Sequence, residues 1–295
     1  MTLGLAARRI PTASLFIVAA LVLAGCQTGG TRAPTPTPGV DPAVGSQVNI
    51  QSLTEVVTRN PNDPSAYNVR GIAYGDAGLN REAIADFTRA IQLNPSYFLA
   101  YANRALVYRR MGQLEEALAD YNRALQVNPN YVAAFTGRGD LYRSQGRLDL
   151  ALADYNAALL VDRADARSYY GRGLVYQAQG ALDQAIADFS LAISFDPRQA
   201  APYAARGQVY LSRSNYDAAY DDLYQAASRD GSSADIWTNL GLALEGKGDL
   251  VNAYTAFNNA LQISPSNQTA LAGAQRTLAA AQAASTQVVA GAVAP

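Results

Sequence analysis

Histidine is absent from the 295 residues, and the chain has one cysteine, Cys26, and one lysine, Lys247. Without histidine, Ser-His-Asp and Cys-His nucleophile pairs, histidine metal ligands and histidine proton relays are excluded. A single cysteine forms neither an intrachain disulfide nor a thiolate zinc cluster. Only carboxylate or Ser-Lys chemistry remains open, and Lys247 lies between two glycines in a predicted turn. We therefore expect no catalytic residue, no metal site and no cofactor, and hence a protein that is not an enzyme.

An excess of charge of either sign is also missing. The chain has 23 basic and 24 acidic residues, a formal net charge of −1, and charged residues make up 16% of it. Binding to nucleic acid requires a strongly basic surface, so nucleic acid is not an expected partner. The apolar share of 49% is normal for a globular chain and argues against wholesale disorder.

The unbroken apolar run of residues 15–24 is too short to cross a bilayer. A spanning helix needs about 20 apolar residues, whereas the hydrophobic region of a signal peptide needs roughly 7–15. Arg8 and Arg9 precede the run and supply the basic start of such a peptide. We therefore assign residues 1–25 to a signal peptide. Twin-arginine export stays open as an alternative, but Ile10 and Pro11 follow the arginines where that signal requires an apolar pair after a spacer.

The apolar run ends in Leu-Ala-Gly-Cys at residues 23–26. This ending resembles the bacterial lipobox, which implies cleavage before Cys26, lipidation of Cys26, and attachment to the membrane by lipid alone. Each buried methylene contributes about 0.8 kcal/mol, so the two or three acyl chains that the resemblance implies would anchor firmly. The resemblance and Gln27 favour an outer-membrane lipoprotein facing the periplasm over an inner-membrane one. Residues 26–45 are rich in proline and threonine and are expected to form an extended tether.

The region from residue 64 to residue 267 repeats itself every 34 residues without an insertion. We number the residues of one window as places 1 to 34. Place 4 is aromatic, place 8 is glycine or alanine, and places 20 and 27 are alanine in every window, which predicts a pair of closely packed helices. The six windows are 64–97, 98–131, 132–165, 166–199, 200–233 and 234–267.

This pattern resembles the tetratricopeptide repeat. The resemblance implies an all-α fold, a right-handed superhelical solenoid in which each helix hairpin buries its apolar face against its neighbours. The ends of such a stack need caps. We expect residues 46–63 to form an N-terminal half-repeat cap and residues 268–284 a C-terminal capping helix, followed by a tail at residues 285–295.

Arginine occupies place 7 and aspartate place 23 in the first five windows, and the sixth window lacks both. Joint presence and joint loss within one chain predict that the two residues form a salt bridge between the helices of a hairpin. A functional series of acid–base pairs is the alternative. The predicted pairs are Arg70 with Asp86, Arg104 with Asp120, Arg138 with Asp154, Arg172 with Asp188, and Arg206 with Asp222.

The candidate binding residues follow from the family resemblance. In tetratricopeptide proteins the concave groove is formed mainly by places 2, 5, 9, 12 and 13 of the first helices, and these places vary here. Arginines and one free tyrosine at these places suit an acidic peptide segment or a C-terminal carboxylate, and a solvated charged face is the alternative. The expected partner-binding residues are Arg109, Arg110, Arg143, Arg167 and Tyr170.

Two further patterns bear on function. Of the 18 tyrosines, 11 fill places 4, 11 and 24 and are expected to form the core. The fifth window departs from the pattern at Ser214, Leu223, Tyr224 and Arg229, which indicates drift, a hinge or a partner surface.

The resemblance implies a scaffold or adaptor that binds peptide segments of other envelope proteins in the periplasm, for example by recruiting envelope enzymes or a processing protease. The alternatives are binding of peptidoglycan or another glycan, and a role in pilus or outer-membrane assembly. The sequence also leaves a homodimer open.

Overall fold

The computed structural model of the protein describes residues 46–292, with side chains through residue 283. The expected signal peptide, the lipidation of Cys26 and the tether fall on residues 1–45 and lie outside the described residues. Within the described part, every regular element is an α-helix, and none of these helices is long and apolar enough to span a bilayer. The helices are α1 (Gln47–Arg59), α2 (Pro64–Asp76), α3 (Asn80–Leu93), α4 (Phe98–Arg110), α5 (Leu114–Val127), α6 (Val132–Ser144), α7 (Leu148–Val161), α8 (Ala166–Ala178), α9 (Leu182–Phe195), α10 (Ala200–Ser212), α11 (Tyr216–Arg229), α12 (Ala234–Gly246), α13 (Leu250–Ile263) and α14 (Gln268–Ala292).

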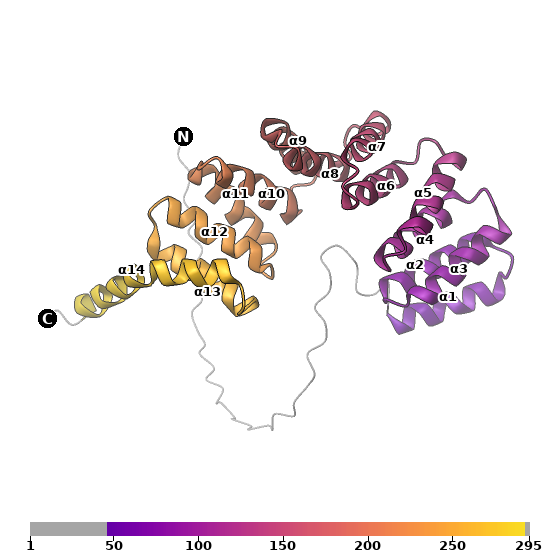
Figure 1. Ribbon diagram of the computed structural model, residues 1–295. Coiled ribbons are helices and arrows are strands. Elements are labelled where there is room, and N and C mark those ends of the chain that lie inside the picture. Colours follow the sequence, from indigo (N-terminus) through magenta and orange to yellow (C-terminus); the bar gives the residue numbers. More distant parts are fainter. Residues whose placement is uncertain (1–45, 293–295) are drawn as a thin grey trace, which may run out of the picture. The chain divides into compact units, whose positions relative to one another are not determined.

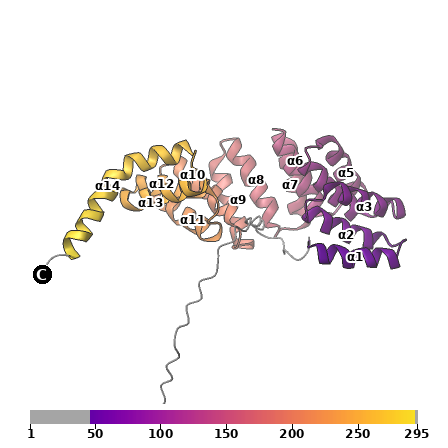
Figure 2. The same ribbon diagram turned by 90° about the horizontal axis from the view of Figure 1, so that it is seen from below.

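Six helix hairpins follow one another from α2 to α13, and the two helices of each hairpin lie side by side (Figure 1). Each hairpin packs on the next, and the first helices of successive hairpins, α2, α4, α6, α8, α10 and α12, also contact one another (Figure 2). The helix α1 packs on α2 at one end and α14 packs on α13 at the other. The predicted all-α solenoid of helix hairpins is confirmed.

The turn inside each hairpin is set by one residue with a positive φ. Gly78 ends the first hairpin's leading helix at φ 76°, and glycines at the same place in the second, third, fourth and sixth hairpins do the same. Glycine adopts this left-handed conformation without a steric penalty. The fifth hairpin uses Ser214 at φ 56°, which costs roughly 1–2 kcal/mol for a residue with a Cβ.

The core lies between the helices and repeats with the sequence. The alanines at places 20 and 27, such as Ala151 and Ala158 of the third hairpin, are fully buried and let the helix backbones approach. The ring at place 24, for example Tyr155 or Phe189, is fully buried between one hairpin and the next. Burial of one such side chain contributes about 1.5–3 kcal/mol, so the repeat pattern stabilises every interface in the stack.

The C-terminal cap is longer than predicted. The helix α14 continues to Ala292, whereas the sequence analysis ended the capping helix at residue 284 and assigned residues 285–295 to a tail. The segment from residue 285 to residue 290 contains neither glycine nor proline, so no residue in it stops the helix.

Candidate functional site

The five arginine–aspartate pairs form a ladder along the stack. In each pair the guanidinium donates two hydrogen bonds to the carboxylate, with N–O distances of 2.6 to 2.8 Å. Only 5–9% of each aspartate side chain is exposed. In Arg138, the hydrogen bond to Asp154 raises the pKa of the guanidinium. The pairs connect the two helices of each hairpin, so they are structural rather than part of an open site.

Each ladder arginine after the first also reaches the preceding hairpin. Its Nη1 donates a hydrogen bond of 2.6 to 2.8 Å to the polar side chain at place 25 of that hairpin. These contacts couple one hairpin to the next through a fixed side-chain geometry. The acceptors are Thr88 for Arg104, Asn122 for Arg138, Asn156 for Arg172 and Ser190 for Arg206.

The ladder ends between the fifth and sixth hairpins. There the three corresponding places carry Tyr224, Leu240 and Ala256, and the arginine, its aspartate and its acceptor are all lost together. These three residues, with Trp237, line a cavity of about 250 Å³, and 54% of Tyr224 is exposed. The interface between the last two hairpins therefore has apolar and aromatic side chains at the places of the ladder, and an ion pair of 2.7 Å between Lys247 and Asp217 also joins these hairpins.

A separate group of charged and aromatic side chains lies in the second to fourth hairpins, with its charged members on the first helices. Its centre is the carboxylate of Asp140 in α6, of which only 13% of the side chain is exposed. Arg167 from α8 donates a hydrogen bond of 2.6 Å to Oδ2, and the Tyr155 hydroxyl from α7 donates one of 2.8 Å to Oδ1. Arg109 from α4 forms a looser ion pair of 3.8 Å with Oδ2. Side chains from three hairpins therefore share one carboxylate.

Two more residues complete this group. Arg143 lies close enough to Tyr155, and Arg109 close enough to Tyr121, for each guanidinium to oppose the rise in the pKa of that tyrosine. We call Arg109, Tyr121, Asp140, Arg143, Tyr155 and Arg167 the arginine cluster; it holds three guanidinium groups and one carboxylate.

The electrostatics of the cluster favour an additional anion. Burial, reinforced by the charge of Asp140, raises the pKa of Tyr155, so its hydroxyl remains a proton donor at neutral pH. Burial lowers the pKa of Arg167, but the combined effect of Asp140, Tyr121 and Asp165 raises it by more, so this guanidinium remains charged. The Nε atoms of Arg109 and Arg143 are buried and have no acceptor among the described residues. The cluster thus has three guanidinium groups but one carboxylate, and two of its buried Nε donors lack an acceptor. A second carboxylate from outside the chain would balance the charge and accept these hydrogen bonds.

The structure separates Arg110 from the residues with which the sequence grouped it. Its Nη1 donates a hydrogen bond of 3.0 Å to the backbone carbonyl of Gly75 in the preceding hairpin. The guanidinium fits there because Gly75 has no Cβ, which would lie 2.9 Å from its Nη2 atom. Arg110 therefore links two hairpins and does not belong to the arginine cluster.

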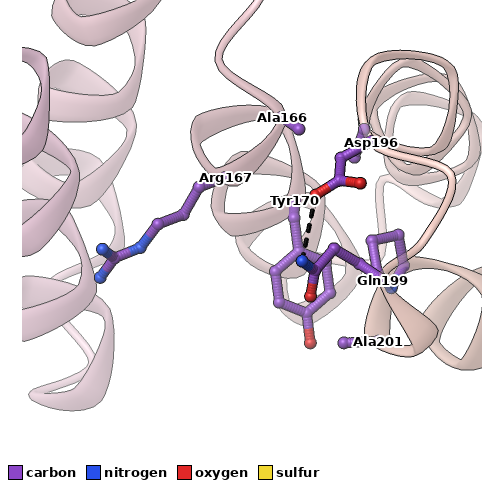
Figure 3. Close-up of a pocket in the computed structure, with 8 residues that line it drawn as sticks. Ala166, Arg167, Tyr170, Asp196, Gln199 and Ala201 are labelled. Atoms are coloured by element: carbon purple, nitrogen blue, oxygen red, sulfur yellow. Dashed lines mark hydrogen bonds between the residues drawn. The ribbon is translucent and has the colours of Figure 1, made fainter. Parts of the chain in front are cut away.

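Tyr170 lies on the next turn of α8 from Arg167 and borders a cavity of about 340 Å³ (Figure 3). Its ring packs 6.0 Å from the ring of Phe189, and burial raises the pKa of its hydroxyl. The side chain of Arg167 points away from Asp196 and Gln199, which line the other side of the cavity (Figure 3). Tyr170 therefore stands at the border between the arginine cluster and this cavity.

Sequence reasoning assigned Tyr121 and Tyr155 to the core alone and missed their part in the cluster. The repeat contains a sequence feature that distinguishes these two tyrosines. Place 24 is tyrosine only in the second and third windows, and in both cases glycine follows 16 residues later, at Gly137 and Gly171. A Cβ on these glycines would lie 2.6 and 2.5 Å from the tyrosine ring, so the glycines make space for the phenol.

Groups of histidine, cysteine, aspartate and glutamate that could hold a metal ion do not occur in the described part of the chain. The site that the geometry defines is thus a cationic cluster beside a cavity bordered by Tyr170, on a stack of helix hairpins. These are the features of an interaction module of helical repeats.

Comparison with known families supports this class. Profiles described as the tetratricopeptide repeat match residues 64–97, 98–131, 166–199 and 204–268, and one described as TPR repeat matches residues 139–180. Together these matches cover more than half of the chain. The chain belongs to the tetratricopeptide repeat family. No curated protein matches the sequence.

Several solved structures share the fold. The APC/C hetero-tetramer Cut9–Hcn1 is similar with a TM-score of 0.71 and 22% identity, over 79% of this chain and only 46% of that chain. PilF of Pseudomonas aeruginosa has a TM-score of 0.66 and 18% identity, over 75% of this chain and 99% of that chain. PilW, described as a widely conserved type IV pilus biogenesis factor, has a TM-score of 0.63 and 18% identity, over 73% and 98%. At these identities the similarity establishes the fold.

Proposed function

We propose that this protein is an adaptor that binds acidic peptide segments or C-terminal carboxylates of partner proteins in its concave groove. The observation that carries the proposal is the arginine cluster, in which two of three guanidinium groups, those of Arg109 and Arg167, pair with one carboxylate, and the buried Nε atoms of Arg109 and Arg143 lack an acceptor. A ligand carboxylate would supply the missing acceptor through charge-assisted hydrogen bonds. The tetratricopeptide fold supports a role in protein–protein interaction, and the groove on that fold supports recognition of a peptide segment.

We further propose that the adaptor acts as a lipid-anchored protein on the periplasmic side of the outer membrane. The support is the sequence of residues 15–26, with its apolar run and its terminal Leu-Ala-Gly-Cys. Its partners would then be other envelope proteins, such as enzymes brought to a substrate or to a processing protease.

A role in pilus or outer-membrane assembly is the second candidate. It is favoured by the similarity to PilF and PilW, because this chain covers nearly the full length of both structures. The two candidates differ in the partner and share the groove, so the same variants test the groove in both.

Replacing Arg109 and Arg143 together by glutamine is expected to weaken binding of an acidic peptide about tenfold. Each substitution removes one positive charge and one unsatisfied buried Nε donor while it preserves most of the side-chain length. The affinity is measured by fluorescence anisotropy at low salt with a labelled peptide that ends in three glutamates. The salt dependence of binding should decrease in the variant, because charges at an interface mainly steer association.

The matched control replaces Arg59 and Arg123 by glutamine, which removes the same net charge from exposed positions outside the cluster. This variant should bind like the wild type. An amidated form of the peptide separates recognition of the C-terminal carboxylate from recognition of the side chains. Equal affinities of wild type, cluster variant and control at low salt would contradict the proposed groove.

Replacing Cys26 by serine is expected to abolish lipid attachment and leave a soluble or uncleaved protein. A serine hydroxyl cannot form the thioether to the diacylglycerol group that the lipobox resemblance implies. Membrane fractionation and incorporation of radiolabelled palmitate provide the measurement. A Cys26→Ser protein that still took up label and stayed with the membranes would rule out lipidation at this residue.

A further inference from the structure

The groove continues from Tyr170 into a second cavity of about 280 Å³. Tyr170 and Ala201 line both this cavity and the one beside Arg167, so the two adjoin. The wall of the second cavity consists mostly of small and apolar side chains on α8, α10 and α12. Its charged members are Asp230 and Asp235, at the far side from the arginine cluster.

These two carboxylates have no basic partner among the described residues. Asp230 accepts hydrogen bonds from the backbone N–H and the hydroxyl of Ser232, at 3.0 and 2.7 Å. Asp235 is exposed in the first turn of α12, where it interacts favourably with the helix dipole. Neither charge is neutralised within the described part of the chain, so the second cavity has an acidic border.

The negative charge of Asp230 is not required by the local turn. The same turn at place 31 is made with asparagine in the first two windows, where Asn94 and Asn128 accept from the backbone two residues later. An asparagine at residue 230 would therefore keep the turn and remove only the charge.

From this arrangement we infer that the groove selects a segment whose acidic and basic residues are separated. In the bound segment, the acidic residues contact Arg143 and Arg167, and the small or apolar residues cover Tyr170. The basic residues of the segment contact Asp230 and Asp235. The charge complementarity of the two ends fixes both the composition and the orientation of the segment. This inference rests on the proposed function, because it assigns the ligand's acidic end to the same arginine cluster.

The repeat spacing sets the length of the segment. The arginine cluster reaches α8, and Asp235 lies two hairpins further on, in α12. Packed helices are about 10 Å apart, so the two charged ends are separated by roughly 20 Å. An extended chain covers about 3.3 Å per residue, which places the acidic and basic residues about six positions apart.

The test uses the full chain and two labelled peptides of identical composition. In the first, two glutamates are followed by a five-residue spacer of alanine, leucine and serine and then by two arginines, and it is made in both chain directions. In the second, the glutamates and arginines alternate. We expect one direction of the separated peptide to bind at least fivefold more tightly than the alternating peptide at low salt.

The decisive variant replaces Asp230 and Asp235 by asparagine. It should reduce the preference for the separated peptide about fivefold, because the ion pairs between the peptide's arginines and these two at least partly exposed carboxylates are lost. Asp162→Asn is the control for the loss of charge in this turn, because Asp162 makes the same turn as Asp230 and lines neither cavity. In a reciprocal test, Asp235→Arg should favour a peptide whose two arginines are replaced by glutamates.

The outcomes separate this inference from the function on which it rests. If Arg109→Gln with Arg143→Gln weakens binding but the aspartate variant binds both peptides like the wild type, the separated-charge ligand is wrong and the groove stands. If neither variant changes the affinity, or the wild type binds neither peptide, both the inference and the proposed groove are overturned. The inference is supported only if the wild type binds the separated peptide more tightly than the alternating peptide and the aspartate variant does not.

Discussion

Replacing Arg138 by alanine is expected to lower the free energy of unfolding by about 2–3 kcal/mol. The substitution leaves the carboxylate of Asp154 without its two hydrogen bonds of 2.8 and 2.6 Å in a position where 6% of the side chain is exposed. A buried charge that loses its partner costs about 3–5 kcal/mol, and the partial exposure of the pair reduces that cost. Asp154→Ala should cost less, because 20% of Arg138 is exposed and its Nη1 keeps the hydrogen bond to Asn122.

The double variant should cost less than the sum of the two single variants, since neither charge is then stranded. A coupling of about 1–2 kcal/mol is expected from denaturant unfolding of the four proteins. A further variant, Arg138→Leu with Asp154→Ala, copies the pair that the sixth hairpin contains at Leu240 and Ala256. It should be more stable than either single alanine variant, because it restores apolar packing.

The control for this cycle is the exposed pair of Arg59 and Glu55, 3.2 Å apart in α1. Arg59→Ala should change the unfolding free energy by less than about 0.5 kcal/mol, as exposed pairs of this kind contribute little. Strict additivity of Arg138→Ala and Asp154→Ala would contradict a direct interaction in the ladder.

Gly171→Val is expected to destabilise the protein by about 3 kcal/mol. A Cβ at this position would lie 2.5 Å from two ring atoms of Tyr155. The ring is fully buried and its hydroxyl is held by Asp140 at 2.8 Å, so it cannot withdraw without breaking that hydrogen bond. Overpacking of a core costs typically 1–3 kcal/mol, and a β-branched side chain adds further contacts to the same ring.

Gly171→Ala should cost less than the valine variant, because alanine's higher helix propensity offsets about 1 kcal/mol of the steric cost. Gly231→Ala is the control, since its added Cβ would meet only a backbone oxygen at 3.6 Å. Thermal unfolding ranks the three variants, and peptide binding reports whether the displaced tyrosine disturbs the arginine cluster. A stable Gly171→Val protein with unchanged binding would show that the ring has more space than the structure gives it.

The fold could be predicted because the chain contains six examples of the same environment. Alanine recurs at places 20 and 27 in all six windows, so the contact between the helices can be identified from this one sequence without comparison to others. The joint loss of place 7 and place 23 in one window identifies the residues of the ladder in the same way. A residue that recurs at the same place in all windows indicates that every hairpin has the same packing requirement there. The structure has the expected hairpins.

The arginine cluster could be predicted only in part, because it does not recur. The places on the first helices predicted Arg109, Arg143 and Arg167 as binding residues, but the contacts of Asp140 with Arg167 and Arg109, 27 and 31 positions away, depend on side-chain conformations that no periodicity encodes. Arg110 was misplaced because its binding to the Gly75 carbonyl depends on the space that one glycine leaves. The end of α14 was placed too early because alanine-rich sequence without a stop residue gives no boundary.

The interruption of the ladder before the sixth hairpin divides the stack into two kinds of joint. At each earlier joint the ladder arginine donates a hydrogen bond to the preceding hairpin, whereas at the last joint the same places carry Tyr224 and Leu240, and the ion pair of Lys247 with Asp217 is 2.7 Å long. In a solenoid, stability is a sum of hairpin terms and nearest-neighbour terms, so local opening begins at the joint with the fewest oriented bonds. We therefore expect the amides of α12 to α14 to exchange as a separate unit that includes Asp235. A ligand that bridges both halves of the groove would close this joint and slow amide exchange in α12 to α14, far from the cluster that binds its acidic end.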